Sequence, residues 1–322
     1  MVTQAIAAMA RGGVADAVAE RPRTVPELAA TTGLDEDAFR RVLRALAALG
    51  IFRVDDDGLV SNTPSSEYLR SDVGGSVRWI AQSFAGDHYR VWEYAAEAFE
   101  QGGAVAERAL GESYFDWLAH HPAEAEIFNR AMAAGSAVRF EALVERAWSD
   151  ELVVDIGGGT GGLLAALLGR HTGLRGIVVD LPHSAAAAEA RLAEAGIADR
   201  CTFVSGDFFA EVPAGGDVYV LSQILHDWDD EAATRILRTC RAAAEPSSGL
   251  LILDAVLPEG DGAHLAKLLD LHMLVLHGGR ERTEAEWRVL LRAGGFELER
   301  AEVTGAFPVI EARPLASDAE TD

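Results

Sequence analysis

The stretch LVVDIGGGTGG, residues 152–162, constrains the fold more than any other part of the sequence. An apolar run typical of a buried strand ends in an aspartate, and five of the next seven residues are glycine. Glycine adopts positive φ and lets a ligand come close to the main chain, and the amides at the start of a helix attract polar groups. The stretch therefore predicts a strand, a tight turn and a helix that together hold a nucleotide-like ligand.

The pattern of the chain after residue 150 extends this unit into a sheet. Strand-like runs occur at 151–156, 175–180, 201–205, 217–222 and 250–256. Helix-like segments lie between them, around 162–170, 184–195 and 231–244. This alternation predicts a doubly wound α/β sheet. Two last runs, 296–303 and 307–312, are too close together for a parallel crossover, so that pair should be antiparallel.

The first 75 residues show the pattern of a winged helix. Thr24 and Glu27 form a capping-box pattern, a second helix starts at Asp35 and stops at Gly50, and IFRVDDDGLVSNT predicts a hairpin around an Asp-Gly turn. The acidic start of the second helix argues against DNA binding and favours a packing or dimerisation role. Residues 76–148 are predicted to be helical, and their many aromatic residues suit both a core and a surface that lines a pocket for a flat ligand.

The composition excludes several classes of protein. A net charge of −23 disfavours nucleic acid as a partner. The sequence contains no apolar run of 18 or more residues, so no membrane span is predicted, and we recognise no export signal at the N-terminus. Cys201 and Cys240 have no metal-ligand spacing, so we expect reduced thiols in a cytoplasmic protein.

The glycine turn alone leaves two ligand classes open. Gly157, Gly159 and Gly162 match the dinucleotide fingerprint GxGxxG, and Asp180 at the end of the next strand would accept hydrogen bonds from ribose. A nicotinamide dehydrogenase fits this pattern, and so does an enzyme with an adenosyl ligand. Asp155 would repel a pyrophosphate and attract a cationic sulfonium, which favours S-adenosylmethionine (SAM).

Two further strand ends carry polar residues that suit such a ligand and its chemistry. Asp207 in GDFF is placed to meet an adenine amine, with Phe208 beside the base, although Asp207 could instead cap a turn. His226 in LSQILHDWDD follows the fourth strand and Asp254 ends the fifth, so both should reach the same edge. A phenol has a pKa of about 10 and histidine one of about 6.5, so a histidine base would need the help of a carboxylate.

At this point the chain resembles a known family. The motifs LVVDIGGGTGG, VVDLPH, GDFF, LHDWDD, LDAVLPE, GGRERTEAEW and LLRAGGF stand in the order and spacing of the SAM-dependent O-methyltransferases of the caffeate/isoflavone type, and are most similar to bacterial relatives of secondary metabolism. The resemblance covers essentially the whole chain. It implies a Rossmann-like sheet of seven strands with the last antiparallel, and an N-terminal winged-helix-like dimerisation domain.

The resemblance also implies a domain organisation and a set of ligands. The expected division is a dimerisation domain at 1–75, a helical substrate-lining region at 76–148 and a SAM-binding catalytic domain at 149–315. SAM would be converted to S-adenosyl-L-homocysteine without a metal. The expected partners are a small aromatic acceptor and a second copy of the chain, with no nucleic acid and no membrane.

Roles for individual residues follow from the same resemblance. His226 would be the general base, flanked by Asp254 and Glu281. The expected cofactor contacts are Asp155, Gly157, Gly159, Asp180, Asp207, Phe208, Ser222, Ser136 and Met132. The expected acceptor contacts are Phe128, Met132, Trp148, Met273, His277 and Asp227. Ser222 stands where plant relatives often carry lysine, and His277 stands where they carry asparagine.

Three alternatives stay open at this stage. A family member that binds SAM but hydroxylates or decarboxylates its substrate would share these motifs. A nicotinamide dehydrogenase would share the glycine fingerprint, and a ligand-sensing regulator would share the winged helix. The acceptor is expected to be a flat phenolic polyketide, quinone, phenazine-like or indolic compound, and transfer to nitrogen also remains open.

Overall fold

The computed structural model describes residues 1–301 and 308–316, with the side chains of 136 and 137 left out. The chain forms two compact units. The first unit is Met1–Tyr94 with Glu107–Ala137, and the second is Ala95–Ala106 with the chain from Val138 onward. The predicted division at residues 75 and 148 stays a prediction.

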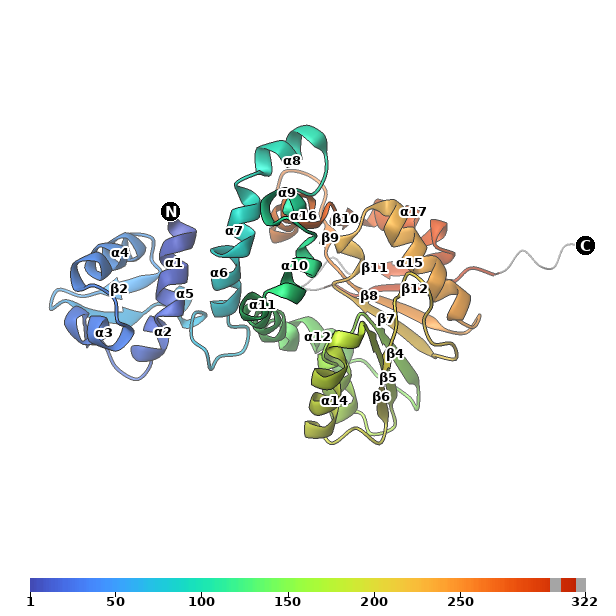
Figure 1. Ribbon diagram of the computed structural model, residues 1–322. Helices are drawn as coiled ribbons and strands as arrows, with labels where there is room; N and C mark the ends of the chain where they lie inside the picture. Colours follow the sequence, from blue (N-terminus) through green and yellow to red (C-terminus); the bar gives the residue numbers. More distant parts are fainter. Residues whose placement is uncertain (302–307, 317–322) are drawn as a thin grey trace, which may run out of the picture. The chain divides into compact units, whose positions relative to one another are not determined.

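The first unit begins with the predicted helices and hairpin (Figure 1). Its helices are α1 (Val2–Arg11), α2 (Val14–Ala17), α3 (Val25–Thr32), α4 (Glu36–Ala48) and α5 (Pro64–Glu67). The hairpin of β2 (Phe52–Val54) and β3 (Leu59–Asn62) turns at Gly58, and Thr24 and Glu27 form the predicted capping box. A third strand, β1 (Arg23–Thr24), pairs with β3 and was not predicted, because two residues carry no periodic signal.

The rest of the first unit is helical, as expected. It contains α6 (Arg78–Phe84), α7 (Asp87–Trp92), α10 (Tyr114–His120), α11 (Pro122–Ala134) and all but the first residue of α9 (Ala106–Leu110). Helix α6 packs against both α1 and α11. Among the described residues, none of the helices is long and apolar enough to cross a membrane.

The second unit is built on a seven-stranded sheet in the order β11-β12-β8-β7-β4-β5-β6. The strands are β4 (Leu152–Ile156), β5 (Arg175–Asp180), β6 (Cys201–Ser205), β7 (Val218–Ser222), β8 (Gly249–Leu253), β11 (Phe296–Ala301) and β12 (Ile310–Pro314). Strand β12 runs antiparallel to both of its neighbours, which confirms the predicted orientation. Parts of the two last predicted strands lie outside the described residues. The run 250–256 is divided, because β9 (Val256–Leu257) leaves the sheet to pair with β10 (Arg282–Thr283).

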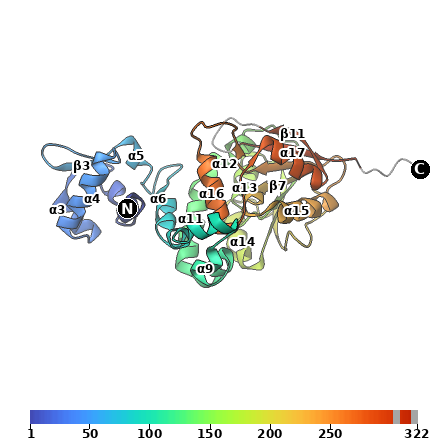
Figure 2. The same cartoon turned by 90° about the horizontal axis from the view of Figure 1, so that it is seen from above.

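Helices cover both faces of this sheet (Figures 1 and 2). One face packs against α15 (Asp230–Ala243) and α17 (Glu284–Ala293) around the buried Trp287. The other face packs against α12 (Ser136–Val144), α13 (Gly162–Arg170) and α14 (Ala185–Glu194). Helix α16 (Leu265–His277) contacts α8 (Ala95–Gln101), and the amide of Val105 donates to the carbonyl of Val275 at 3.0 Å.

The carboxyl ends of the parallel strands gather polar side chains at one edge. Asp155 lies in β4, Asp180 ends β5, Ser222 ends β7 and Asp254 follows β8. Two short 3₁₀ turns also leave this edge, η1 (Pro182–Ser184) after β5 and η2 (Leu225–Asp227) after β7. This edge is where open α/β sheets bind their ligands.

Candidate active site

The glycine turn after β4 is held by its own main-chain amides. Gly157 and Gly159 have φ values of +69° and +56°, which favour glycine. The amides of Gly157 and Gly158 both donate to the carbonyl of Val179, at 2.8 and 3.2 Å. The amide of Gly159 donates to Oδ2 of Asp180 at 2.8 Å. Since these three amides already have acceptors, the turn is poorly suited to cradle a pyrophosphate.

The carboxylates beside the turn favour a cation. Asp155 is 1% exposed, and its Oδ2 has no hydrogen-bond partner among the described residues. Burial, together with the charge of Asp180, raises the pKa of Asp155 to about 7. A buried acceptor oxygen without a partner costs free energy that a cationic ligand would recover. The residues at this turn therefore fit a sulfonium compound better than a dinucleotide.

The two acids predicted to hold the adenosine part each have main-chain partners. Asp180 accepts from the amides of Gly159 and Leu181 and from Oγ of Ser184, and its Oδ2, which takes only the bond from Gly159, keeps a lone pair for a ribose hydroxyl. Asp207 accepts from the amide of Phe209 at 2.8 Å, so the turn-capping role considered above is present. The ring of Phe208 borders the turn, because its Cε1 lies 3.6 Å from the position of a Cβ on Gly157.

A strained residue carries the chain from β7 to the η2 turn. Gln223 has φ = +57°, and it is the one non-glycine residue with positive φ among the described residues. Both its amide and its Nε2 donate to the carbonyl of Leu253, at 3.3 and 3.0 Å. Ser222 comes just before it, and its buried Oγ has no hydrogen-bond partner in the described part of the chain. Backbone strain of this kind concentrates at functional sites.

His226 lies in the η2 turn among three carboxylates. Its ring is buried, and Nδ1 lies 2.9 Å from Oε1 of Glu281. Nε2 lies 3.5 Å from Oδ1 of Asp227. Asp254 is 1% exposed, and neither of its carboxylate oxygens has a hydrogen-bond partner among the described residues.

These charges control the protonation of the imidazole. Burial alone lowers the pKa of His226, but the negative charges of Asp254, Asp227 and Glu281 outweigh it and raise the pKa to about 10. Burial raises the pKa of Asp227 to about 7 and also raises that of Asp254. The proton affinity of His226 is therefore close to that of a phenol, whose pKa is about 10.

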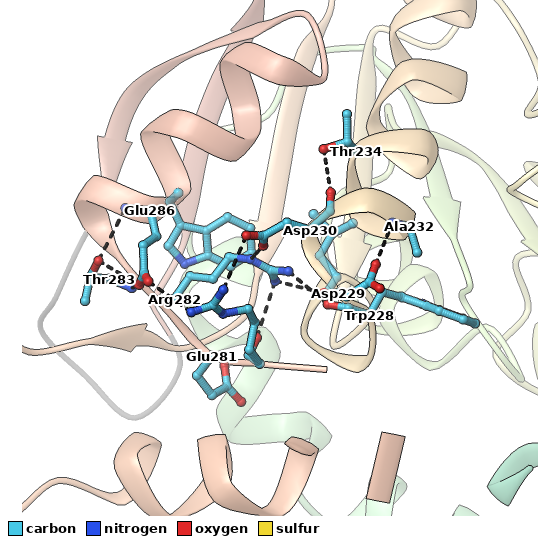
Figure 3. Close-up of polar contacts among 12 residues, drawn as sticks. Trp228, Asp229, Asp230, Ala232, Thr234, Glu281, Arg282, Thr283 and Glu286 are labelled. Carbon is cyan, nitrogen blue, oxygen red and sulfur yellow. Dashed lines mark hydrogen bonds and ion pairs between the residues drawn. The ribbon is translucent and has the colours of Figure 1, made fainter. Parts of the chain in front are cut away.

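A buried arginine holds the η2 turn in place (Figure 3). Arg282 is 0% exposed and donates to the carbonyls of Leu225 and Trp228 at 3.0 and 2.9 Å. Its Nε donates to Oδ1 of Asp230, in the first turn of α15, at 2.9 Å. The residue just before it is Glu281, so the segment that carries this carboxylate also fixes the turn that carries His226.

The segment 279–282, which carries Glu281 and Arg282, also contacts the main chain of His226. A Cβ on Gly279 would lie 2.1 Å from the carbonyl oxygen of His226 and 2.4 Å from the carbonyl carbon of Asp227. The amide of Arg280 donates to that carbonyl of His226 at 2.9 Å. Only glycine leaves room for this contact. We had not predicted Arg282 or Gly279 as site residues, although both lie in the motif GGRERTEAEW.

Two protein-family models match this chain. Residues 92–297 match the O-methyltransferase domain, and residues 1–72 match the O-methyltransferase dimerisation domain. The chain belongs to the O-methyltransferase family. This confirms the family that the motifs predicted.

Individual relatives agree with this family. Phenazine O-methyltransferase PhzM of Lysobacter antibioticus is 44% identical over 317 residues, 98% of this chain and 93% of that protein. The mitomycin biosynthesis 6-O-methyltransferase of Streptomyces lavendulae is 40% identical over 305 residues, 92% of this chain and 86% of that protein. The O-methyltransferase NcsB1 from neocarzinostatin biosynthesis, in complex with S-adenosyl-L-homocysteine and 1,4-dihydroxy-2-naphthoic acid, matches with a TM-score of 0.84 and 33% identity over 98% of this chain and 97% of that chain. Together with the sheet order, these matches confirm the predicted fold.

The predicted acceptor residues of this O-methyltransferase family member lie in both units. Met273 is buried on α16, and Nε2 of His277, at the end of the same helix, lies 3.8 Å from Oδ1 of Asp227. Trp148 donates from Nε1 to the carbonyl of Leu143 at 2.7 Å and packs against the core beside α13.

The remaining predicted contacts belong to the first unit. Phe128 and Met132 lie on α11, and the ring of Phe128 packs edge-on against that of Tyr114 at 5.8 Å. The side chain of Ser136 lies outside the described residues. In the part of the chain that the structure describes, no group of three or more His, Cys, Asp or Glu residues could hold a metal ion.

One buried charge in α12 was also missed. Arg139 is 9% exposed, and burial lowers its pKa although the charge of Asp254 opposes this. A lone arginine within the otherwise mostly apolar helix SAVRFEALV is a weak signal. It could have been found only by knowing that α12 covers the sheet.

Proposed function

We propose that this chain is a SAM-dependent O-methyltransferase that methylates a phenolic hydroxyl of an aromatic natural product, with His226 as the general base. The observation that carries the proposal is the pairing of His226 Nδ1 with Glu281 at 2.9 Å. A proton on Nδ1, donated to the carboxylate, leaves Nε2 of the neutral ring as the proton acceptor. The imidazole belongs to the same sheet edge as the glycine turn and Asp155.

The cofactor assignment rests on the chemistry of the turn. SAM supplies a methyl group that is already activated by its positively charged sulfur. The proposed contacts are Asp155 for the cationic part, Gly157 and Gly159 for close approach, Asp180 for ribose, and Asp207 with Phe208 for adenine. Ser222, Ser136 and Met132 are proposed to complete this set, and no metal is needed.

The role of the base is to match the acceptor's proton affinity. The carboxylates around His226 bring its pKa to about 10, so transfer from a phenol carries almost no free-energy cost. The same value means that His226 carries a proton in the free protein at neutral pH. His226 must therefore give this proton to solvent as the phenol binds, before Nε2 takes the proton of the phenol, so that the reactive pair is phenolate and imidazolium.

The relatives support an aromatic acceptor of natural-product type. Their names refer to a phenazine and to mitomycin, and the NcsB1 complex contains a dihydroxynaphthoic acid. We propose that the acceptor is lined by Phe128, Met132, Trp148, Met273, His277 and Asp227.

We also propose that the chain forms a homodimer through the dimerisation domain. The proposed domain division is 1–75, 76–148 and 149–315. We propose a cytoplasmic location, which suits the free, buried thiols of Cys201 and Cys240.

The test is His226→Ala with a panel of hydroxylated phenazines and naphthoic acids as acceptors. We expect the wild type to add one methyl group, seen as a gain of one CH₂ in the product mass. The variant should lose roughly 100-fold or more in turnover, while calorimetry gives an affinity for SAM close to wild type. A folded variant that methylates normally would show that His226 is not the base.

The alternatives give different results in the same experiments. A hydroxylase or decarboxylase would change the substrate mass without adding a methyl group. A dehydrogenase would bind NAD and ignore SAM, and a regulator would shift DNA at low salt.

A further inference from the structure

One glutamine joins the ends of two neighbouring strands at the sheet edge that carries His226. Gln223 directly follows β7, which pairs in parallel with β8 up to Ser222 and Leu253. The amide of Gln223 donates to the carbonyl of Leu253 at 3.3 Å, and its Nε2 donates to the same oxygen at 3.0 Å. The main-chain bond is long for an N–H donor, so the side chain supplies the better of the two bonds.

That carbonyl determines where Asp254 lies. It belongs to the planar peptide group that joins Leu253 to Asp254. Asp254 is buried, and neither of its carboxylate oxygens has a hydrogen-bond partner in the part of the chain that the structure describes. Since no hydrogen bond of its own holds this carboxylate there, its position depends on the main chain before it, which the two donors of Gln223 fix.

The backbone of Gln223 is strained, which makes its side chain informative. Its φ of +57° lies in the region that glycine adopts freely and in which a side chain costs free energy. A glycine would avoid this cost, but it would bring no side-chain donor to the carbonyl of Leu253. The Nε2 bond therefore offsets a strain that accompanies the turn from β7 into η2.

The other side of this turn is fixed by packing. Ile224, the next residue, fills the space beside the glycine turn, because a Cβ on Gly157 would clash with its side chain. This contact does not involve the amide group of Gln223. Loss of the Nε2 bond should therefore loosen the β8 side of the site and leave the glycine turn in place.

Titratable groups face His226 from each element packed against it. They are Asp227 in η2, Asp254 after β8, Glu281 before β10, and His272 and His277 on α16. Burial lowers the pKa of His272 to about 4 and that of His277 to about 3, so both rings are neutral. Glu281 is bonded to the ring and Asp227 belongs to the same turn, so both follow His226. Asp254 is the one acid of this group that needs a separate support.

We propose that Gln223 is a positioning residue that holds Asp254 beside His226 by donating from Nε2 to the carbonyl of Leu253. The inference rests on the proposed function, because it takes His226 as the general base. In this role Gln223 touches neither the acceptor nor the methyl group. It acts through Asp254, whose charge raises the proton affinity of the imidazole.

Gln223→Met is the first test, because methionine keeps the length of the side chain and removes its donor. Asp254 should then lie farther from the ring on average. We expect the ionisation of the base in the pH profile of kcat/KM to move down by about one pH unit, and kcat at neutral pH to fall by about tenfold. SAM affinity should stay near wild type. Gln101→Met, on an exposed part of α8, is the matched control and should leave the profile unchanged.

A double variant tests whether the effect passes through Asp254. Asp254→Asn removes the charge itself, so adding Gln223→Met to it should cause no further shift of the profile. Equal shifts with and without the charge of Asp254 would overturn the inference, and so would a wild-type profile in Gln223→Met. Gln223→Gly accepts the positive φ without strain and has no donor, so it should shift the profile in the same direction even if Gln223→Met does not fold. A wild-type profile in Gln223→Gly would also overturn the inference.

A titration without turnover keeps the inference separate from the proposed function. The imidazole of His226 is titrated by NMR in the complex with S-adenosyl-L-homocysteine, and its signal is identified by its absence from His226→Ala. A lowered pKa in Gln223→Met, in a protein that methylates nothing, would contradict the proposed function and retain this inference. Methylation that depends on His226, with the same titration in Gln223→Met as in the wild type, would do the reverse.

Discussion

Nδ1 of His226 lies 2.9 Å from Oε1 of Glu281, although 55 residues separate them in the chain. The contact decides which nitrogen faces the acceptor, because a proton shared with Glu281 leaves Nε2 unprotonated in the neutral ring. Asp254 is buried nearby and acts on the ring through its charge, without a hydrogen bond of its own among the described residues. Glu281 therefore orients the ring and also shares with Asp254 and Asp227 in raising its proton affinity.

Glu281→Gln should separate these effects. The amide keeps the size of the side chain but removes a negative charge, so the pKa of His226 should fall from about 10 towards its ordinary value. We expect turnover to drop by roughly 100-fold at neutral pH, because the weakened base no longer matches the acceptor.

The pH profile of that variant is the decisive measurement. The ionisation of the base should move to lower pH in Glu281→Gln, whereas calorimetry should show little change in SAM affinity. An unchanged profile would mean that Glu281 does not set the pKa of His226. Glu284→Gln, on an exposed face of α17, serves as the matched control.

The cation-binding role of Asp155 predicts a pH-dependent affinity. The pKa of Asp155 is raised to about 7, so its carboxylate is protonated as the pH falls through this value and loses its attraction for a sulfonium. SAM affinity should therefore fall below pH 7, and the neutral thioether S-adenosyl-L-homocysteine should show a weaker dependence. In Asp155→Asn we expect SAM affinity to drop by about tenfold and the pH dependence to flatten.

Calorimetry with both compounds from pH 5.5 to 8.5 checks this. The useful quantity is the ratio of the two dissociation constants, because general damage to the site weakens both ligands together. Equal losses for SAM and its thioether product in Asp155→Asn would argue against a charge-based role.

How much of the fold could be predicted from the sequence depends on how far apart in the chain the interacting residues lie. The sheet strands and their helices follow from local patterns of apolar residues, and the sequence patterns placed most of them within two residues. The two-residue strands β1 and β10 exist only because a partner lies beside them, so no local pattern could indicate them.

The site shows the same limit. His226, Asp254 and Glu281 were predicted as a group from motifs, but which carboxylate would touch the imidazole is a tertiary fact. The motif GGRERTEAEW contains Arg282, but the motif does not indicate that the guanidinium donates to the carbonyl of Leu225, which lies 57 residues away in the chain. Sharing of Asp227 between two imidazoles depends likewise on how α16 packs against η2.

Arg282→Met should destabilise the turn that carries His226. The substitution leaves the carbonyls of Leu225 and Trp228 without their charged donor, and buried acceptors that lose such a partner cost about 3 kcal/mol. We expect the free energy of unfolding in urea to fall by about that amount. Arg280→Met removes a half-exposed arginine whose ion pairs lie at the surface, and should cost well under 1 kcal/mol. Similar losses in both variants would contradict the role given to Arg282.

Gly279→Ala tests whether the position of the η2 turn limits catalysis. The added Cβ would stand 2.1 Å from the carbonyl oxygen of His226, so the main chain of the turn must move by about an ångström or more. A displacement of that size at a catalytic group costs on the order of 100-fold in rate. SAM affinity should stay near wild type, because the contact lies on the side of His226 and not at the glycine turn. Gly262→Ala is the matched control, since nothing lies within 4 Å of its Cβ position and its φ is not positive. If Gly279→Ala keeps wild-type turnover, the turn is free to shift, and the base does not depend on the support of the segment that carries Glu281.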